Sequence, residues 1–323
     1  MRGLVLTAAL FFCISEAAIA QPENAEAIEV TTFVVDLRPR DRQDRVVGQF
    51  RFMGGIVLRS TDRRFGGISG LRFLPDGDTL LAVSDRGNWI SLRPLFEGEA
   101  LVGAVDARLW PMLGVDGAPL ESPAFDAESL TLVGDTAFVS FEREHRIDAY
   151  HTPWGTENPR PTPYRSASAF GALENNGGLE GLTNLADGRF LAFAEAPRSD
   201  NTFDGWLMDA EGGTQSLALL AQDPYRVTDL ATLPNGDIVS LERRFSPIGG
   251  VGARLRHIAL DRINPSALAD GNVIAELGSG YTVDNMEGLA VREHEGRTEI
   301  FIISDDNQNP LQRTILMAFE LTR

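Results

Sequence analysis

Short apolar strands, separated by turns rich in glycine and aspartate, recur along the chain. The clearest unit is GGLEGLTNLADGRFLAFAEA, residues 177–196, in which two apolar strands flank the turn at Asp187-Gly188. Such a pattern predicts a β-hairpin, and a hairpin brings its two open ends together. Each open end carries an acid, Glu180 at one and Glu195 at the other. Convincing amphipathic helices are absent, so the sequence predicts an all-β fold.

Four other segments repeat this unit. They are GGISGLRFLPDGDTLLAVSDRG (66–87), FDAESLTLVGDTAFVSFERE (125–144), YRVTDLATLPNGDIVSLERR (225–244) and DNMEGLAVREHEGRTEIFIISDDN (284–307). Periods near fifty residues with several short strands are typical of propeller blades, so we predict a single β-propeller. The units align, at intervals of 59, 52, 48 and 59 residues, on Ser69, Glu128, Glu180, Thr228 and Glu287.

Both ends of the chain also contain strand-like segments. IEVTTFVVDL and FMGGIVLRS stand near the N-terminus, and TILMAFELT stands at the C-terminus. We expect these segments to form a composite last blade that closes the ring and hides its edges. Added to the five repeats, this blade makes six the favoured count, with five as the alternative.

The propeller geometry predicts where the acids lie. The start of the innermost strand of a blade and the end of the next strand meet at the same mouth of the ring. Five pairs of residues should therefore converge there: Ser69 with Asp85, Glu128 with Glu142, Glu180 with Glu195, Thr228 with Glu242, and Glu287 with Asp305.

Carboxylates gathered in this way repel one another. At ~5 Å and an effective dielectric constant near 20, each like-charged pair costs roughly 3 kcal/mol. Such a cluster persists if acids stay protonated, if arginines lie between them, or if a cation binds. Oxygen donors without cysteine and with few histidines favour Ca²⁺, with Mg²⁺ as the alternative. The structural alternative is that the acids pair with neighbouring arginines and merely tie the blades together.

The first twenty residues have the pattern of a secretory signal peptide. A basic residue at Arg2, an apolar run and the Ala18-Ile19-Ala20 cleavage signal predict export to the periplasm or the exterior, with the propeller domain in residues 21–323. The one cysteine, Cys13, lies inside this leader. No later segment is apolar enough for a membrane span.

The net charge of −17 argues against a nucleic-acid partner. The chain contains no lysine, since all 29 basic residues are arginine, and this excludes Schiff-base chemistry on lysine. No motif for an organic cofactor is present, so none is expected. The sequence leaves the oligomeric state open.

The units resemble those of the bacterial phytase-like family, which is described as having esterase-like activity of phytase. The resemblance extends from about Phe52 to Leu321, and its most specific motifs are the SDRG of residues 84–87 and the SDDN of residues 304–307. It implies a β-propeller that hydrolyses phosphomonoesters or other esters at the acidic mouth. The sequence departs from the repeat at Glu195-Ala196-Pro197, where no arginine follows the acid, and at Thr228.

The leading hypothesis is therefore a metal-assisted hydrolase of a small anionic ester. One carboxylate, Glu142 or Glu195, would be the general base, and Arg86, Arg143 and Arg243 would bind the substrate. A non-enzymatic periplasmic binding or scaffold propeller is the alternative, and a calcium-dependent lactonase is a weaker one. The metal ligands would be Asp85, Glu128, Glu180, Glu287, Asp305 and Asp306.

Overall fold

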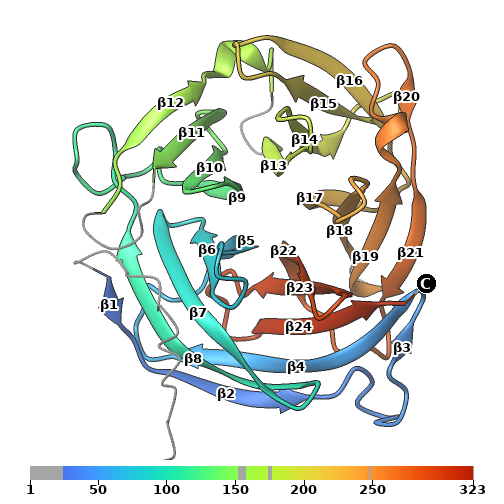
Figure 1. Cartoon of the computed structure of the whole chain (residues 1–323). Helices are drawn as coiled ribbons and strands as arrows, with labels where there is room; N and C mark the ends of the chain where they lie inside the picture. Colours follow the sequence, from blue (N-terminus) through green and yellow to red (C-terminus); the bar gives the residue numbers. More distant parts are fainter. Residues whose placement is uncertain (1–24, 152–157, 174–176, 247–248, 323) are drawn as a thin grey trace, which may run out of the picture.

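Five sheets surround a central axis as the blades of a propeller (Figure 1). The computed structural model describes residues 25–151, 158–173, 177–246 and 249–322. In every blade the first strand of a repeat lies innermost, and the following strands pair outward one after another. The predicted all-β propeller is confirmed.

The first three blades each contain one of the first three repeats. Blade 1 has the order β5 (Ile68–Phe73), β6 (Leu80–Ser84), β7 (Asn88–Glu97), β8 (Ala100–Pro111) and β1 (Glu26–Ala27). Blade 2 has the order β9 (Ala127–Val133), β10 (Thr136–Phe141), β11 (Arg146–His151) and β12 (Pro161–Arg165). Blade 3 has the order β13 (Leu179–Asn184), β14 (Phe190–Pro197), β15 (Thr202–Met208), β16 (Thr214–Leu220) and β20 (Leu268–Ala269).

The last two blades complete the ring. Blade 4 has the order β17 (Arg226–Thr232), β18 (Ile238–Ser246), β19 (Gly250–Ile258) and β21 (Asn272–Leu277). Blade 5 has the order β22 (Asn285–His294), β23 (Arg297–Asp305), β24 (Thr314–Leu321), β4 (Phe50–Ser60) and β2 (Val30–Val35), and β3 (Val46–Val47) pairs with β4. Within the described ranges, the helical elements are two 3₁₀ turns, η1 (Ala167–Ala169) and η2 (Leu260–Arg262).

The favoured count of six blades is wrong, because the structure has five. The terminal strands do close the ring, but they do not form a blade of their own. Strands β4 and β2 continue the sheet that β22, β23 and β24 begin, so they are the outer strands of the fifth repeat. The repeat spacing thus gave the correct number of blades, and the extra blade came from counting the closing strands separately.

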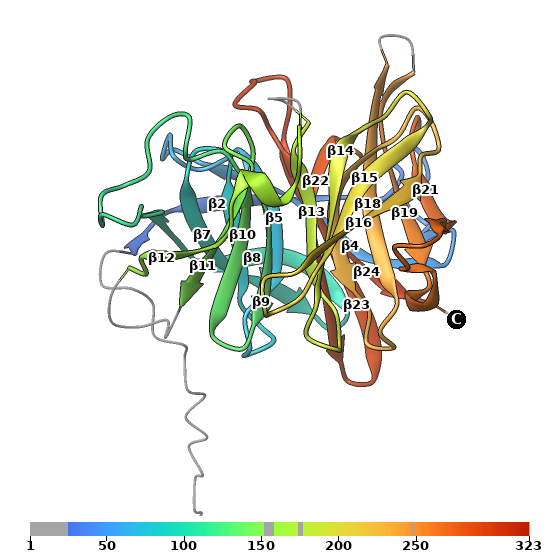
Figure 2. The ribbon, with the colours of Figure 1, turned by 90° about the horizontal axis from the view of Figure 1, so that it is seen from above.

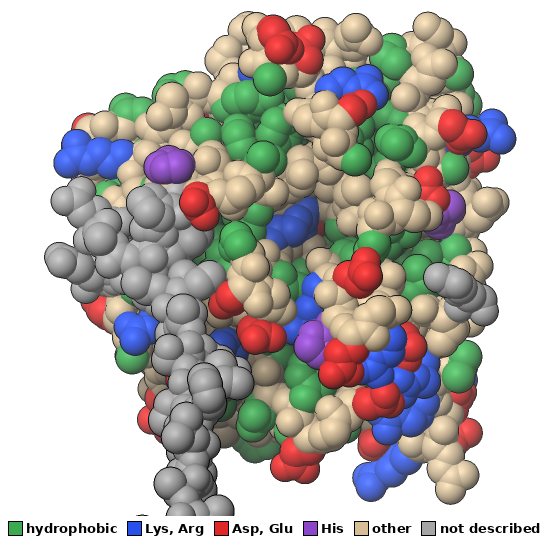
Figure 3. Space-filling model, in the orientation of Figure 1, with side chains coloured by type: hydrophobic (Ala, Val, Ile, Leu, Met, Phe, Trp, Pro, Cys, Tyr) green, Lys and Arg blue, Asp and Glu red, His purple; other side chains and the backbone are tan. Residues whose placement is uncertain are grey.

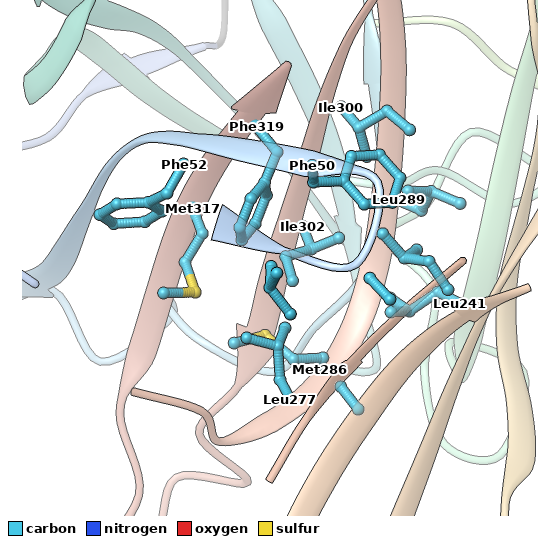
Figure 4. Close-up of a cluster of buried hydrophobic side chains, with 14 of the residues drawn as sticks. Phe50, Phe52, Leu241, Leu277, Met286, Leu289, Ile300, Ile302, Met317 and Phe319 are labelled. Carbon is cyan, nitrogen blue, oxygen red and sulfur yellow. The ribbon is translucent and has the colours of Figure 1, made fainter. Parts of the chain in front are cut away.

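Buried apolar side chains fill the spaces between neighbouring blades. Figure 4 shows the cluster between blades 4 and 5, where Phe319 of β24 packs against Phe50 and Phe52 of β4, with ring centroids 6.2 and 5.5 Å apart. Because β4 and β24 come from opposite ends of the chain, this contact closes the ring. Fully burying one such side chain contributes about 1.5–3 kcal/mol.

In two of the repeats a glycine directly follows the acid of the innermost strand, and this glycine lies where adjacent blades pack closely near the axis. A β-carbon on Gly181 would lie 2.7 Å from Leu230 of the next blade, and one on Gly288 would lie 3.1 Å from Leu71. Real side chains do not approach so closely without a shift of one strand. Glycine after the acid therefore lets the innermost strands of adjacent blades come together.

An ion pair on the axis connects all five innermost strands. Arg72 of β5 donates hydrogen bonds to both carboxylate oxygens of Asp229 of β17, at 2.9 and 3.2 Å. The guanidinium also donates to the backbone carbonyls of Leu182 in β13, at 2.7 Å, and of Leu289 in β22. Asp229 accepts the hydroxyl of Ser129 in β9 at 2.7 Å and the N–H of Leu289 at 2.8 Å. Both charged side chains are buried, and burial raises the pKa of Asp229 even though Arg72 opposes the shift.

The end of the ring toward which the innermost strands run has a shallow central hollow. Arg72 lines a pocket of about 350 Å³ at this end, together with the hydroxyl side chains of Thr131, Thr183 and Thr232. Figure 3 shows this hollow with a basic side chain in it. The acids predicted to cluster belong to the opposite end. Among the described residues, no helix has the length and apolar character needed to cross a membrane.

We predict that Arg72→Met lowers the free energy of unfolding by about 3–5 kcal/mol, because it leaves a buried carboxylate without its counter-charge. Urea denaturation measures the change. Arg189→Met is the control, since Arg189 pairs with Asp187 on an exposed turn and should change stability by no more than about 0.5 kcal/mol. A loss below about 1 kcal/mol for Arg72→Met would contradict the structural role of this pair.

Candidate functional site

In every blade the innermost strand has a β-bulge at the position on which the repeats align. The register between the first and second strands shifts by one residue there, so one residue of the innermost strand has no partner. A bulge bends the strand and changes the direction of the side chain, and bulges are common beside active sites. The five unpaired residues are Ser69, Glu128, Glu180, Thr228 and Glu287.

The same register identifies the equivalent residue at the end of each second strand. In each blade, the residue before the bulge pairs with one residue of the second strand. In blades 1 to 5 this partner is Ser84, Phe141, Ala194, Glu242 and Ser304, and the equivalent position is the next residue along the chain. The equivalent positions at the mouth are therefore Asp85, Glu142, Glu195, Arg243 and Asp305.

The expectation that Glu242 joins the cluster is wrong by one residue. A shift of one residue along a strand turns the side chain to the other face of the sheet. Glu242 is fully buried within blade 4, where it accepts hydrogen bonds from Arg254 at 2.7 Å and from Arg256 at 2.6 Å. Thr228, its predicted partner, donates instead to the backbone carbonyl of Met286 at 3.1 Å.

Carboxylates from the other four blades do gather at one mouth. Oxygens of Asp126, Glu128 and Glu142 in blade 2 lie within 4.8 Å of one another, which is close enough for all three to hold one metal ion. Each carboxylate of the cluster affects the pKa of others in neighbouring blades, as expected for a single group. We call this group the acidic mouth: Asp85, Asp126, Glu128, Glu142, Glu180, Glu195, Glu287 and Asp305.

Asp126 was missed by the sequence analysis. It precedes β9 directly and stands two residues before Glu128. Side chains two residues apart in an extended chain lie on the same side, so this spacing was the available signal. Aligning the repeats on the bulge position singled out one residue at the start of each unit, and Asp126 is not that residue.

Backbone N–H groups hold Glu142 in place. Its Oε1 atom accepts hydrogen bonds from Gly177 at 2.6 Å and from Gly178 at 3.1 Å. His145 packs at the same point, since a β-carbon on Gly178 would lie 2.8 Å from its Nδ1 atom and 3.0 Å from Cγ of Glu142. The Gly-Gly step at the start of the third repeat therefore positions a carboxylate of the second.

The three predicted substrate-binding arginines differ in their surroundings. Arg86 is exposed, and no carboxylate of the described residues forms an ion pair with it. Arg143 pairs with Asp126 and keeps about half of its side chain, 54%, exposed. Arg243 is half-buried within the acidic mouth, in contact with Glu195 at 2.9 Å.

Burial and mutual repulsion raise the pKa values of six carboxylates of the acidic mouth: Asp85, Glu128, Glu142, Glu180, Glu287 and Asp305. Burial is the largest cause in each case, and it raises the pKa of Asp85 to about 7 and that of Asp305 to about 6, with neighbouring carboxylates adding to both shifts. The pKa of Glu287 is raised to about 8 although Arg243 opposes the shift. The pKa values of Glu128 and Glu180 are raised well above their ordinary range.

The donor set fits a hard divalent cation. Glu128 and Glu180 have no hydrogen-bond donor among the described residues, and Oδ1 of Asp85 is buried without a partner. Such oxygens suit Ca²⁺ or Mg²⁺, which bind through carboxylates. Asp306 differs, because its two oxygens accept hydrogen bonds from the backbone of Gln308 at 3.0 Å and the hydroxyl of Thr314 at 3.2 Å.

A basic pocket adjoins the acidic mouth between blades 5 and 1. Its volume is about 740 Å³, and Arg86 and Asp306 connect it to the carboxylates. The loop between β23 and β24, red at the upper edge of Figure 2, forms part of its wall. The arginines that line it are Arg59, Arg63, Arg86 and Arg313.

Comparisons with solved structures find similar chains at low sequence identity. The catalytic domain of the Coprinopsis cinerea GH62 α-L-arabinofuranosidase matches with a TM-score of 0.51 at 10% identity, covering 86% of this chain and 99% of that chain. The glutaminyl cyclase of Myxococcus xanthus matches with a TM-score of 0.44 at 15% identity, over 80% of this chain and 92% of the other. The Malassezia sympodialis allergen Mala s 1 matches with a TM-score of 0.46 at 14% identity, over 89% and 91%. At these identities the likeness concerns the fold alone.

Comparisons of the sequence give the family. No curated protein matches the chain. The family model for phytase-like proteins, described as esterase-like activity of phytase, matches residues 63–308. This range begins just before the first repeat and ends just after the last, so it includes every carboxylate of the acidic mouth. The chain therefore belongs to the phytase-like family.

Proposed function

We propose that this protein is an exported, metal-assisted hydrolase that cleaves phosphomonoesters or other esters at the acidic mouth. The observation that carries the proposal is the convergence of eight carboxylates from four blades beside exposed arginines. The family and the propeller fold support a hydrolase-type propeller. Export rests on the predicted leader, residues 1–20, which lies outside the described residues.

The cation site would lie on the side of the mouth formed by blades 1 and 2. Glu128 would be its central ligand, because its oxygens lie close to those of Asp126 and Glu142 and have no donor among the described residues. Asp85, Glu180, Glu287 and Asp305 border the same space. We assign Asp306 to loop geometry, since the backbone of Gln308 and the hydroxyl of Thr314 use its oxygens. A bound Ca²⁺ would supply Lewis-acid polarisation of an ester or phosphoryl oxygen.

The side chains of this chain would perform the remaining steps. Arg86 forms no ion pair with a carboxylate of the described residues, so it would bind the anionic group of the substrate through charge-assisted hydrogen bonds. Arg143 would neutralise charge at the rim. Glu142 would take a proton from the attacking water, because two backbone N–H groups fix its position and burial raises its pKa toward neutrality. Glu195 suits this role less well, because Arg243 holds its carboxylate.

We predict that the purified protein hydrolyses p-nitrophenyl phosphate, p-nitrophenyl acetate or phytate with Ca²⁺ and loses this activity in EDTA. Glu128→Gln should lower kcat about 100-fold, since it replaces the charged carboxylate of a central ligand with a neutral amide. Glu211→Gln, an exposed acid on the turn between β15 and β16, is the control and should leave kcat unchanged. Absence of turnover on all three esters and on a γ-lactone would favour the scaffold alternative.

A second prediction concerns substrate binding. Arg86→Gln should raise KM for p-nitrophenyl phosphate about 10- to 100-fold, because a hydrogen bond to a charged group contributes about 1.5–3 kcal/mol. KM for uncharged p-nitrophenyl acetate should stay within about twofold. Steady-state kinetics on both esters measure the difference, and equal effects on the two would exclude an anion-binding role for Arg86.

A third prediction concerns pH. Between about pH 4 and pH 8 the folded protein binds more protons than the unfolded chain, because the pKa values of Asp85, Glu287 and Asp305 are raised. The free energy of unfolding in EDTA should therefore fall as pH rises through this window. Ca²⁺ should raise Tm more at pH 8 than at pH 5, since it binds the ionised carboxylates. Thermal denaturation with and without Ca²⁺ at both pH values tests this, and an equal gain in Tm would count against the cation site.

A further inference from the structure

Blade 4 presents a guanidinium where the other blades present carboxylates. The strand register makes Arg243 the equivalent of Asp85, Glu142, Glu195 and Asp305. The bulge of blade 4 carries Thr228 in place of an acid, and the carboxylate of the preceding residue is turned into the blade interior. Blade 4 therefore contributes one positive charge and no carboxylate to the mouth.

Arg243 reaches oxygens of both neighbouring blades. Its Nη2 donates to Oε1 of Glu195 in blade 3 at 2.9 Å, and its Nη1 donates to Oδ1 of Asn285 in blade 5 at 3.0 Å. Its Nε lies 3.1 Å from Oε1 of Glu287. Asn285 also donates to that Glu287 oxygen at 2.7 Å. Three oxygens from two blades thus surround one half-buried positive group, as they would surround a bound cation.

We infer that Arg243 is the protein's own counter-cation for this half of the mouth, so that the mouth binds one divalent ion rather than two. The inference rests on the proposed function only in requiring that the acidic mouth binds a divalent cation. The ion is confined to the half formed by Asp85, Asp126, Glu128 and Glu142. Glu195 and Glu287 are occupied by the guanidinium, which also repels a second ion.

The position of Arg243 depends on Glu242 forming its ion pairs within blade 4. Arg254 and Arg256 of β19 neutralise Glu242, so Arg243 has no carboxylate partner within blade 4 and extends toward the axis. Glu128 and Glu180 also lie within the electrostatic reach of Arg243, after Glu287 and Glu195. Removing Arg243 would leave Glu195, Glu287 and Asn285 as a vacant set of oxygen donors.

Counting bound Ca²⁺ on the full chain tests the inference, by calorimetric titration and by metal analysis after dialysis. Wild type should bind one ion at the mouth. Arg243→Gln should bind two, and Arg243→Lys, which keeps the charge, should bind one. Glu128→Gln should lose the ion, whereas the double variant Arg243→Gln/Glu128→Gln should regain one at the new position. Arg189→Gln, which removes an arginine from the exposed turn at Asp187, is the control and should still bind one.

The inference would be overturned if the wild type binds two ions and variants of the acidic mouth lose or weaken both. It would also be overturned if Arg243→Gln binds the same number of ions as the wild type. If circular dichroism shows that Arg243→Gln does not fold, the number of ions bound by the wild type still tests the inference. A wild-type protein that binds no ion would overturn the cation site of the proposed function, and this inference with it. Loss of esterase activity with one bound ion would instead contradict the proposed function alone.

Discussion

The Arg72–Asp229 pair on the axis is the contact on which the arrangement of the ring depends. Through side-chain and backbone hydrogen bonds it connects the innermost strands of all five blades. It also fixes the strands close to their bulges, since Ser129 follows Glu128 directly and Leu289 stands two residues after Glu287. A charged pair buried at this depth contributes little net stability, because removing both charges from water offsets their attraction. The hydrogen bonds of this pair can form in only one register of the five innermost strands. We therefore attribute the specific alignment of the five similar sheets to this pair.

The aligned bulges convert this register into a chemical site. Each bulge turns one side chain out of the strand ladder, and the ring brings these side chains to a single end. The resulting repulsion is balanced in three ways: a raised pKa favours the protonated form of acids such as Glu180, Arg243 pairs with Glu195 and Glu287, and the oxygens of Glu128 suit a cation. The mouth is therefore poised between protonation and metal binding, which couples its stability to both pH and cation concentration.

The sequence predicted the features that repeat and missed those that depend on register. Fivefold recurrence of a strand pair with acids at its open ends was enough to predict a propeller and a common acidic mouth. The favoured count of six exceeded the five blades found because the closing strands, which pair with β24 in the fifth blade, were counted as a blade of their own. Glu242 was chosen over Arg243 because acids were matched to acids, while a bulge shifts the register by one residue without leaving a mark in the sequence. Arg72 was missed because a single arginine in an apolar strand resembles an exposed residue until the ring is closed.

Differences between the repeats make the charge of the mouth asymmetric. Five identical blades would create a symmetric ring of carboxylates with no preferred place for an ion or an ester. Blade 1 carries Ser69 at its bulge and an exposed arginine after Asp85, whereas blade 4 carries Thr228 and the inward-pointing Arg243. The positive group of blade 4 closes one side of the mouth to cations. The exposed arginine of blade 1 opens the other side toward the basic pocket. The asymmetry of charge, more than the fold, therefore distinguishes the side of the mouth that carries the proposed base, Glu142, from the side that Arg243 occupies.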